Sequence, residues 1–283
     1  MNCQKTNIFI TGCSSGIGLD ALTTLHKKGY SVIGSCRKQS DVERLNQQGF
    51  NCIQLDLADS QSVENAVKEL KQLTNNKIDV LFNNGAFGLP GAVEDLSREA
   101  MQFQFNTNVF GTQELTNLIV PIMRENGGGK IVYNSSILGF AAMQYRGAYN
   151  ASKFAIEGFA DTLRLEVKQD NIQVSLIQPG PIISNFRTNA FAQFKHWINI
   201  DSSAHQTNYQ AMVSRLDAEE SKAPFVLKAD AVTHALTHII KHKRPKIRYP
   251  ITLPTKVFSW LKRLLPTRLL DILLIKAGGD GKR

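Results

Sequence analysis

The sequence of 283 residues is poor in cysteine and tryptophan, and it has no apolar run long enough to span a bilayer. Its four cysteines (Cys3, Cys13, Cys36 and Cys52) include no CxxC pair, so we expect neither a disulfide framework nor a metal site. Reduced thiols are typical of a cytoplasmic protein, and the cytoplasm is the location we predict. The N-terminus also lacks the basic and apolar regions of a signal peptide.

Basic residues are not in excess outside the C-terminal segment. Residues 241–283 hold twelve of the 33 Lys/Arg and two of the 24 Asp/Glu, so this segment carries +10 and the rest of the chain −1. A nucleic-acid-binding surface needs basic residues along the folded body, so we expect no nucleic-acid partner. A hydrophobic content of 42% is enough for one large domain or two small ones.

Apolar runs alternate with helical patterns along most of the chain. The alternation predicts an α/β fold of the Rossmann type, with a doubly wound parallel sheet of about seven strands and helices on both faces. The predicted strands are residues 7–11, 31–36, 51–56, 78–84, 129–136, 172–180 and about 246–249. The predicted helices are residues 16–29, 41–48, 60–73, 98–123, 147–168 and 229–241.

A glycine-rich stretch, TGCSSGIG (11–18), follows the first predicted strand and opens the first helix. Gly12 permits a tight turn, while Gly16 and Gly18 allow the backbone to approach a pyrophosphate at the helix N-terminus. The spacing differs from the common G-x-G-x-x-G, so a turn without a ligand is the alternative. The predicted cofactor contacts here are Gly12, Ser14, Ser15, Gly16, Ile17 and Gly18.

The end of the second predicted strand reads GSCRKQ (34–39). Cys36 stands where an NAD enzyme usually has an acidic residue, and Arg37 and Lys38 follow it. Two cations without an acid favour a 2′-phosphate and thus NADP(H), although solvated surface charges are the alternative. Asp56 is placed to accept from the adenine amino group, or else to cap a helix.

Tyr149 and Lys153 lie four residues apart in GAYNASKFAIEG (147–158), so a helix puts them on one face. A nearby ammonium favours the phenolate, so we predict that Lys153 lowers the pKa of Tyr149 and fits it for acid–base work. Taken alone, such a pair is equally typical of a solvated helix face.

Several motifs in order resemble those of the short-chain dehydrogenases/reductases: TGCSSGIG, LDLAD, NNGA, NVFG, YNSS, YNASK and QPGPI. The resemblance covers about residues 7–249, within the single-domain subgroup. Bacterial NADP-dependent aldehyde reductases, near the retinol and 17β-hydroxysteroid dehydrogenases, are resembled by the stretches ITGCSSGIG, CRK, DVERLNQQGF and RYPITLPTKVFSWLKRLLP. The family resemblance implies a catalytic NAD(P)-binding domain at 1–250, followed by a basic amphipathic extension at 251–283.

The resemblance also implies roles for single residues. Ser136, thirteen positions before Tyr149, would hold the substrate oxygen, and Asn108 would support a water leading to Lys153. Lys153 would also bond the nicotinamide ribose. Further implied cofactor contacts are Leu57, Asn83, Gly85, Pro179, Gly180 and Ile182. The family's usual Asn-Asn-Ala-Gly reads Asn-Asn-Gly-Ala at 83–86 here, from which we expect at most a modest effect.

The segment FRTNAFAQFKHWI (186–198) corresponds to the family's substrate lid. Its aromatic residues favour a lipophilic aldehyde or ketone, and ordinary helix packing is the alternative. We predict substrate contacts at Ser136, Met143, Tyr149 and Phe186, with Ala142 and Tyr145 on the opposite wall. We expect His196 to be structural.

The C-terminal extension mixes Trp260, leucines and basic residues around Pro266. Because the proline breaks the apolar face, packing on the body or on a second subunit is preferred to membrane contact. The sequence thus predicts a reductase of lipophilic aldehydes or ketones, retinal- or steroid-like ones included, that forms a homodimer or homotetramer. The alternatives are a non-catalytic NADP-binding regulator and a membrane-surface protein acting through its basic tail.

Overall fold

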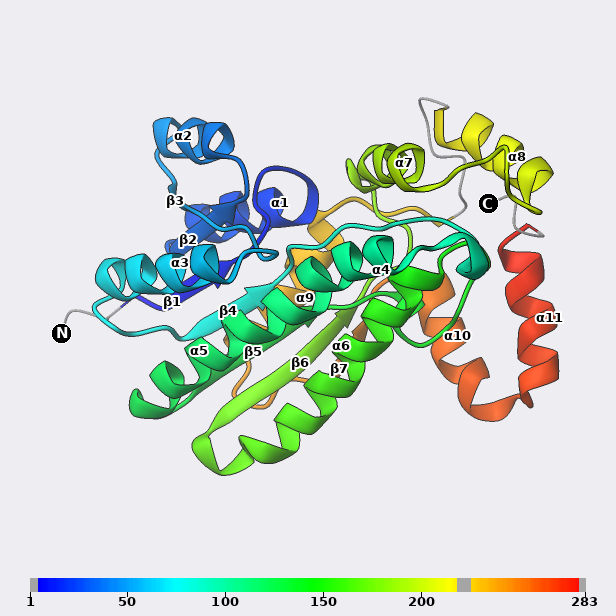
Figure 1. Ribbon diagram of the computed structural model, residues 1–283. Coiled ribbons are helices and arrows are strands. Elements are labelled where there is room, and N and C mark those ends of the chain that lie inside the picture. The colour runs from blue at the N-terminus through cyan, green and yellow to red at the C-terminus, as the bar shows by residue number, and fades with distance from the viewer. Residues whose placement is uncertain (1–4, 218–224, 280–283) are drawn as a thin grey trace.

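The computed structural model describes residues 5–217 and 225–279 and is built around a parallel sheet (Figure 1). Residues 1–4, which start the predicted domain 1–250 and include Cys3, lie outside the described residues. Residues 280–283, which end the predicted extension 251–283, also lie outside them. The sheet has seven strands in the order β3-β2-β1-β4-β5-β6-β7, and every neighbouring pair is parallel. The predicted doubly wound sheet is therefore confirmed. The strands are β1 (Asn7–Ile10), β2 (Ser31–Cys36), β3 (Asn51–Gln54), β4 (Val80–Asn83), β5 (Gly129–Asn134), β6 (Ile172–Gln178) and β7 (Arg248–Pro250).

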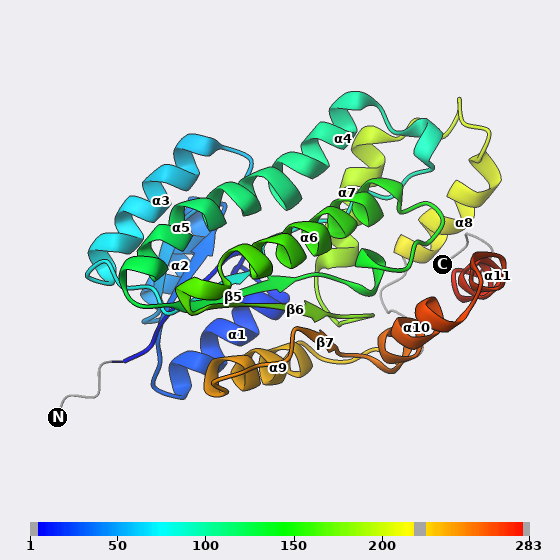
Figure 2. The same cartoon turned by 90° about the horizontal axis from the view of Figure 1, so that it is seen from below.

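Helices cover both faces of this sheet (Figure 2). One face packs on α1 (Gly16–Lys27), α2 (Gln39–Gln47) and α9 (Asp230–Lys241). The other packs on α3 (Ser60–Leu73), α5 (Thr112–Glu125) and α6 (Gly147–Glu166). The remaining helices are α4 (Arg98–Phe105), α7 (Phe186–Trp197), α8 (Gln206–Asp217), α10 (Leu253–Leu264) and α11 (Thr267–Ala277). Short helical turns are η1 (Val93–Asp95), η2 (Asn106–Gly111), η3 (Ile137–Gly139) and η4 (Lys168–Asp170).

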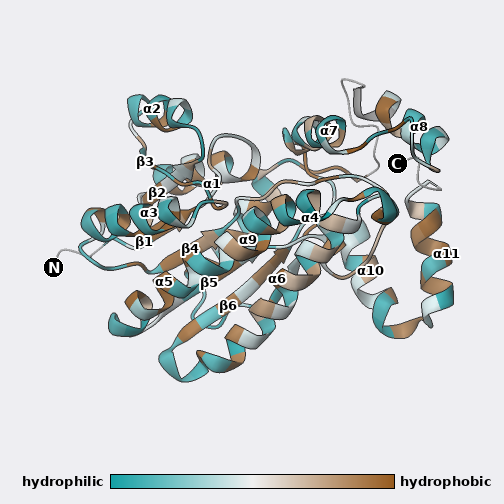
Figure 3. Ribbon diagram, in the orientation of Figure 1, coloured by the Kyte–Doolittle hydropathy of each residue, from teal (hydrophilic) through white to brown (hydrophobic). Residues whose placement is uncertain are grey.

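The strands are apolar without alternation because successive side chains enter two different cores. In β1, Phe9 joins the core under α3 and α5, whereas Ile8 and Ile10 join the core under α1 and α9. Figure 3 shows the same contrast, with hydrophobic residues along the central strands and mixed polarity on the helices.

The predicted helix 98–123 is not continuous. Its middle, η2, is a π-helical turn that separates α4 from α5. A Cβ added to Gly111 in this turn would lie 1.6 Å from the Leu57 carbonyl oxygen, so only glycine allows this approach. The extra residue of the wider turn also places Asn108 inward, where it is 2% exposed.

Two helical pairs extend the body beyond the sheet. Phe191 and Phe194 of α7 pack with Tyr209 and Met212 of α8 in a third core. At the C-terminus, Pro266 separates α10 from α11. Along the described residues, no helix combines the length and the apolar character needed to cross a membrane.

We predict opposite effects of alanine at two helical glycines. Gly111→Ala should lower the free energy of unfolding by about 2 kcal/mol or more, because its Cβ collides with backbone. Gly158→Ala in α6, where a Cβ meets nothing within 4 Å, should raise it by about 0.5–1 kcal/mol. Urea denaturation of both variants checks this, and equal effects would contradict the close approach at Gly111.

Candidate active site

The carboxyl ends of β1, β4 and β5 meet at one edge of the sheet, and hydrogen bonds tie the loops that follow them. The Thr11 hydroxyl oxygen accepts from the backbone N–H groups of Asn84 (2.9 Å) and Gly85 (2.8 Å). The Asn84 amide donates to the Thr11 carbonyl (2.9 Å) and accepts from the Asn134 amide (2.9 Å). Asn84 was not singled out from the sequence, although it joins three strand ends.

The glycine loop forms a cradle of the kind a dinucleotide pyrophosphate needs. Gly12 has φ +73°, and a Cβ there would lie 2.8 Å from the Gly85 Cα. A Cβ on Gly18 would lie 2.1 Å from the Gly12 carbonyl oxygen. Ser15 precedes α1 without capping it through its side chain, so the helix N-terminus keeps its N–H groups for a ligand. These residues fit a nicotinamide dinucleotide.

Arg44 of α2 supports this loop and was missed by the sequence analysis. Its guanidinium donates to the Ser14 carbonyl (2.9 Å) and to Asp41 (2.8 Å). The only sequence signal was an Asp and an Arg three residues apart on a predicted helix. The hydrogen bond from Arg44 to the Ser14 carbonyl ties the glycine loop to α2.

The region after β2 is basic and lacks an acid. Cys36 is buried, with its Sγ 3.7 Å from the Cys52 Sγ. Arg37 and Lys38 are exposed, and within residues 5–217 and 225–279 their side chains make no hydrogen bond or ion pair. Both cations are thus free to meet a ligand.

Asp56 does not cap a helix, so that alternative is wrong. The N-cap of α3 is Asp59, which accepts from the Gln61 backbone N–H at 3.0 Å. Asp56 instead accepts from the Ala58 backbone N–H (3.0 Å) and closes the turn before α3.

The other predicted cofactor residues lie at the strand ends and in the loops of the same edge, but they differ in what they contact. Leu57 is buried against Gly85 and Gly111. The Asn83 amide turns to α5, where it donates to the Thr116 hydroxyl (2.9 Å). After β6, the Pro179 carbonyl accepts from the Ile137 backbone N–H (2.7 Å), Gly180 lies against Thr252, and Ile182 forms a bridge with Leu227.

Tyr149 and Ser136 come together although they belong to different elements. Tyr149 lies in the first turn of α6 and is 8% exposed, and the Ser136 hydroxyl lies close enough to its phenol to act on its pKa. Ser136 follows β5 and also accepts from the Leu138 backbone N–H (3.1 Å), which fixes its side chain. The result is a buried pair of hydroxyl groups at the edge of the sheet.

Lys153 lies one turn further along α6. Its Nζ donates to the Asn134 carbonyl (2.7 Å) and lies 5.7 Å from the centre of the Tyr149 ring. Burial lowers the pKa of Lys153 to about 8, and the charge of Glu157 acts in the opposite direction. Burial also raises the pKa of Tyr149, with Ser136 opposing. The expected lowering of the Tyr149 pKa is thus not found in this state, because the loss of water around the buried phenol dominates.

Glu157 is a further site residue that the sequence analysis missed. It lies one turn beyond Lys153 and is 8% exposed. One carboxylate oxygen accepts from Ser135 (2.6 Å) and Gln178 (2.8 Å), and the other from Arg248 (3.1 Å). Its i+4 spacing from Lys153 was the available signal. These bonds attach α6 to β6, to β7 and to the end of β5.

Asn108 does not touch Lys153 but reaches its neighbour. The amide of Asn108 donates to the Phe87 carbonyl (2.9 Å) and the Ser152 hydroxyl (3.1 Å). Its oxygen accepts from the Phe87 backbone N–H (3.1 Å). The π-helical turn therefore connects the loop after β4 to α6.

Phe186 is the predicted substrate residue that lies directly against Tyr149. The two rings meet edge to face with centroids 5.3 Å apart, and Phe186 is 39% exposed. By contrast, Phe191 and Phe194 are buried in the core between α7 and α8, so ordinary packing explains them. Met143 is half-buried, and its carbonyl accepts from Asn150 (3.0 Å).

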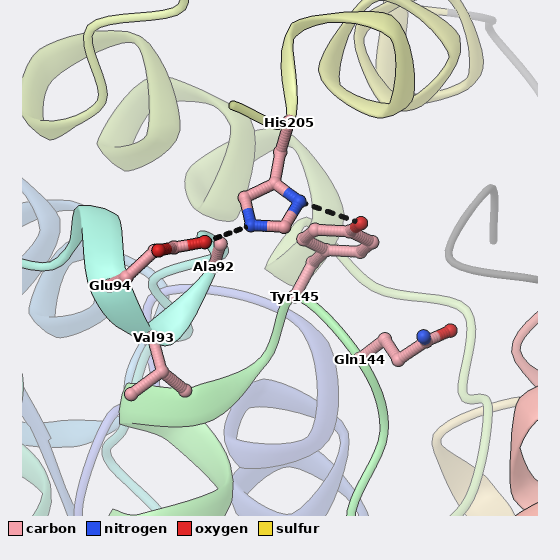
Figure 4. A pocket seen from close by; sticks show the side chains of 6 residues that line it. All are labelled: Ala92, Val93, Glu94, Gln144, Tyr145 and His205. Atoms are coloured by element: carbon pink, nitrogen blue, oxygen red, sulfur yellow. Dashed lines mark hydrogen bonds and ion pairs between the residues drawn. The ribbon is translucent and has the colours of Figure 1, made fainter. Parts of the chain in front are cut away.

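Tyr145 lines an open hollow beside η1 (Figure 4). Tyr145 has φ +57°, and its hydroxyl lies 3.2 Å from Nδ1 of His205. The other ring nitrogen of His205, Nε2, lies 2.5 Å from the Glu94 carboxylate. Tyr145 thus anchors the start of α8 to the body, and its predicted place on the opposite wall stays a prediction. His196 is exposed and contacts Trp197 edge to face.

The glycine cradle, the hydroxyl pair and the lysine together have the character of a dinucleotide-dependent site. A family model described as short chain dehydrogenase matches residues 6–195. The chain belongs to the short-chain dehydrogenase family. The resemblance seen in the motifs is confirmed, and short-chain dehydrogenases are oxidoreductases.

Several short-chain dehydrogenase relatives match over most of the chain. It is 40% identical over 271 residues to the uncharacterized oxidoreductase YbbO of Escherichia coli, with 96% of this chain and 94% of YbbO covered. It is 32% identical over 272 residues to 3-ketodihydrosphingosine reductase of Bacteroides thetaiotaomicron, covering 96% and 97%. It is 37% identical over 203 residues to retinol dehydrogenase 8 of Homo sapiens, covering 68% and 64%.

Solved structures of the family share the fold. A short chain dehydrogenase/reductase from Burkholderia phymatum in complex with NAD matches with a TM-score of 0.76 at 21% identity, covering 93% of this chain and 94% of that one. The likeness at this identity concerns the fold alone.

We predict a pH-dependent contribution of Lys153 to stability. Its pKa is about 8 in the folded protein against 10.5 as a free side chain, so the unfolded chain binds more protons between these values. We therefore compare the free energy of unfolding of the wild type with that of Lys153→Met. The difference, wild type minus variant, should rise by about 2–3 kcal/mol from pH 7 to pH 10. Urea titrations at each pH measure it, with Lys71→Met, an exposed position, as the control. A difference independent of pH would contradict a buried Lys153.

Proposed function

We propose that this short-chain dehydrogenase transfers a hydride between NADP(H) and a carbonyl/alcohol pair, most often reducing the carbonyl. The observation that carries the proposal is the buried hydroxyl pair of Ser136 and Tyr149, with Lys153 one turn away and the glycine cradle at the same edge of the sheet. A regulator that only bound a dinucleotide would need the cradle but not this pair.

The proposed mechanism assigns separate tasks to the side chains. The bound NADPH supplies the hydride. The Tyr149 hydroxyl gives its proton to the carbonyl oxygen, and the Ser136 hydroxyl donates to the same oxygen as negative charge develops there. Lys153 stabilises the phenolate left on Tyr149, a stronger effect than in the neutral phenol, while the Asn134 carbonyl holds its ammonium. Asn108 keeps Ser152 and the loop at Phe87 in place.

The preference for NADP(H) over NAD(H) rests on the end of β2. Cys36 offers no carboxylate to a ribose 2′-hydroxyl, and the neighbouring Arg37 and Lys38 are exposed cations without a protein partner among the described residues. A 2′-phosphate would gain charge-assisted hydrogen bonds there.

We propose lipophilic aldehydes or ketones, retinal- or steroid-like ones included, as substrates. Phe186 offers an apolar ring directly beside Tyr149, and Met143 belongs to the segment that leads into α6. The names of two relatives, a sphingoid-ketone reductase and a retinol dehydrogenase, agree with a long apolar substrate.

We also propose that the enzyme works in the cytoplasm and forms a homodimer or homotetramer. Cys13, Cys36 and Cys52 are free thiols, in agreement with the reducing cytoplasm. Met101, Phe110 and Leu118 expose apolar surface on α4, η2 and α5, as a homodimer or homotetramer would use.

Tyr149→Phe should lower kcat/KM for aldehyde reduction by about 100- to 10,000-fold, because the proton donor is lost. The dissociation constant for NADPH, measured by fluorescence titration, should stay within about threefold, since the ring and its packing remain. Tyr30→Phe, a half-buried tyrosine on the other side of β1, serves as the control. Unchanged turnover in Tyr149→Phe would favour the non-catalytic regulator.

Arg37→Ser combined with Lys38→Ser should weaken NADPH binding by about 10- to 100-fold and leave NADH binding nearly unchanged. The expected selectivity comes from loss of contacts that only the 2′-phosphate makes. Lys71→Ser combined with Arg98→Ser, which removes two other exposed cations, controls for net charge. An equal loss for both dinucleotides would refute the assignment.

A further inference from the structure

Helices α10 and α11, with the two glycines that follow, form a C-terminal hairpin (residues 253–279) on one side of the body, at the right of Figure 1. Its inner face packs on the protein. Phe258, Leu270 and Leu274 join a small core with residues 137–141, which directly follow Ser136. The Lys262 ammonium also lies 4.9 Å from the centre of the Phe154 ring of α6.

The outer face of α10 is an apolar stripe. Leu253, Val257, Trp260 and Leu264 follow one another at helical spacings of four, three and four residues, and they are 45–73% exposed. This spacing puts all four on one side of the helix, away from Thr255 and Phe258.

The outer face of α11 is apolar as well: Leu269, Ile272, Leu273 and Ile275 are 37–51% exposed. The described residues include 21 exposed large hydrophobic side chains, and eight of them fall in the hairpin. Such a concentration of exposed apolar side chains is typical of an interaction surface, whereas single exposed residues are typical of any protein surface. Figure 3 shows the hydrophobic turns of α11 next to polar ones.

The hairpin as a whole is cationic. The described hairpin carries Lys256, Lys262, Arg263, Arg268 and Lys276 against one acid, Asp271. Lys256 and Arg263 each follow a residue of the apolar stripe, Leu253 and Trp260, by three positions, so they flank it on one side. Residues 1–240 are nearly neutral by comparison.

We propose that the C-terminal hairpin docks this enzyme on the surface of an anionic lipid bilayer. Apolar stripes that carry tryptophan and leucine beside lysine and arginine lie in the interface of such membranes. A second copy of the chain fits less well, because two identical hairpins face to face would bring together four net positive charges from each.

The position of the hairpin links docking to the site. Its inner core contacts residues 137–141, next to Ser136, and Thr252 at the start of α10 lies against Gly180 in the loop after β6. The docked enzyme therefore holds the Ser136 side of the site near the lipid. This last step rests on the proposed function, whereas docking itself does not.

Co-sedimentation of the full chain with vesicles tests docking. The vesicles consist of phosphatidylcholine alone or of phosphatidylcholine mixed with phosphatidylglycerol. The test variant is Trp260→Glu with Leu264→Glu. The matched control is Leu73→Glu with Leu165→Glu, which makes the same change of charge at exposed apolar residues of α3 and α6. Reduction of a short water-soluble aldehyde and size-exclusion chromatography are measured on each.

Wild type and control should bind the phosphatidylglycerol vesicles, more weakly at high salt, and the test variant should bind at least about tenfold more weakly. Turnover of the soluble aldehyde should be equal in all three. Three results would overturn docking: no binding by wild type, equal loss in the control, or a test variant that changes oligomeric state instead of vesicle binding. Absence of turnover in all three proteins would count against the proposed function and not against docking.

Discussion

The burial of Lys153 is the constraint on which the site depends. An ammonium at 4% exposure loses its water, and a carbonyl at 2.7 Å replaces only part of that solvation. Glu157, one turn further along α6, supplies the opposing charge and is itself held by Ser135, Gln178 and Arg248. Tyr149, Lys153 and Glu157 therefore form a polar stripe, at i, i+4 and i+8, on a helix that is otherwise packed on an apolar core. The sheet holds α6 in one register because this stripe meets its partners only there.

Much of the fold and part of the site could be predicted from the sequence, because strand and helix periods and short local motifs carry them. The Gly12–Gly18 loop and the Tyr149–Lys153 pair are of this kind. Asn84, Arg44 and Glu157 were missed because their partners are distant in sequence, and only the folded sheet brings them together. The π-helical turn at 106–111 was missed for another reason: one additional residue in a turn does not disturb an apolar period enough to be noticed.

The direction of the Tyr149 pKa shows where local reasoning is insufficient. Spacing along α6 predicts that a cation lowers it, and the two side chains do share a face. Yet Lys153 points to the Asn134 carbonyl, and burial dominates both groups: it raises the pKa of the phenol and lowers that of the ammonium. In this state the phenol keeps its proton, and the ammonium of Lys153, with a pKa of about 8, loses its proton more easily than that of a free lysine. A phenol that keeps its proton until an oxygen arrives beside Ser136 suits a proton donor, and the value of Lys153 then lies in stabilising the phenolate after transfer.

The C-terminal hairpin extends this coupling beyond the sheet. Residues 137–141 have two neighbours: Ser136 precedes them, and the side chains of Phe258, Leu270 and Leu274 cover them. Thr252 fills the space beside Gly180, where a Cβ would lie 2.1 Å from its hydroxyl oxygen. Both loops that border the hydroxyl pair are thus packed against the extension. Pro266 interrupts the apolar pattern of the extension, yet it lets two short helices each turn one face inward and one outward. Packing on the body and contact with lipid are therefore compatible uses of one segment.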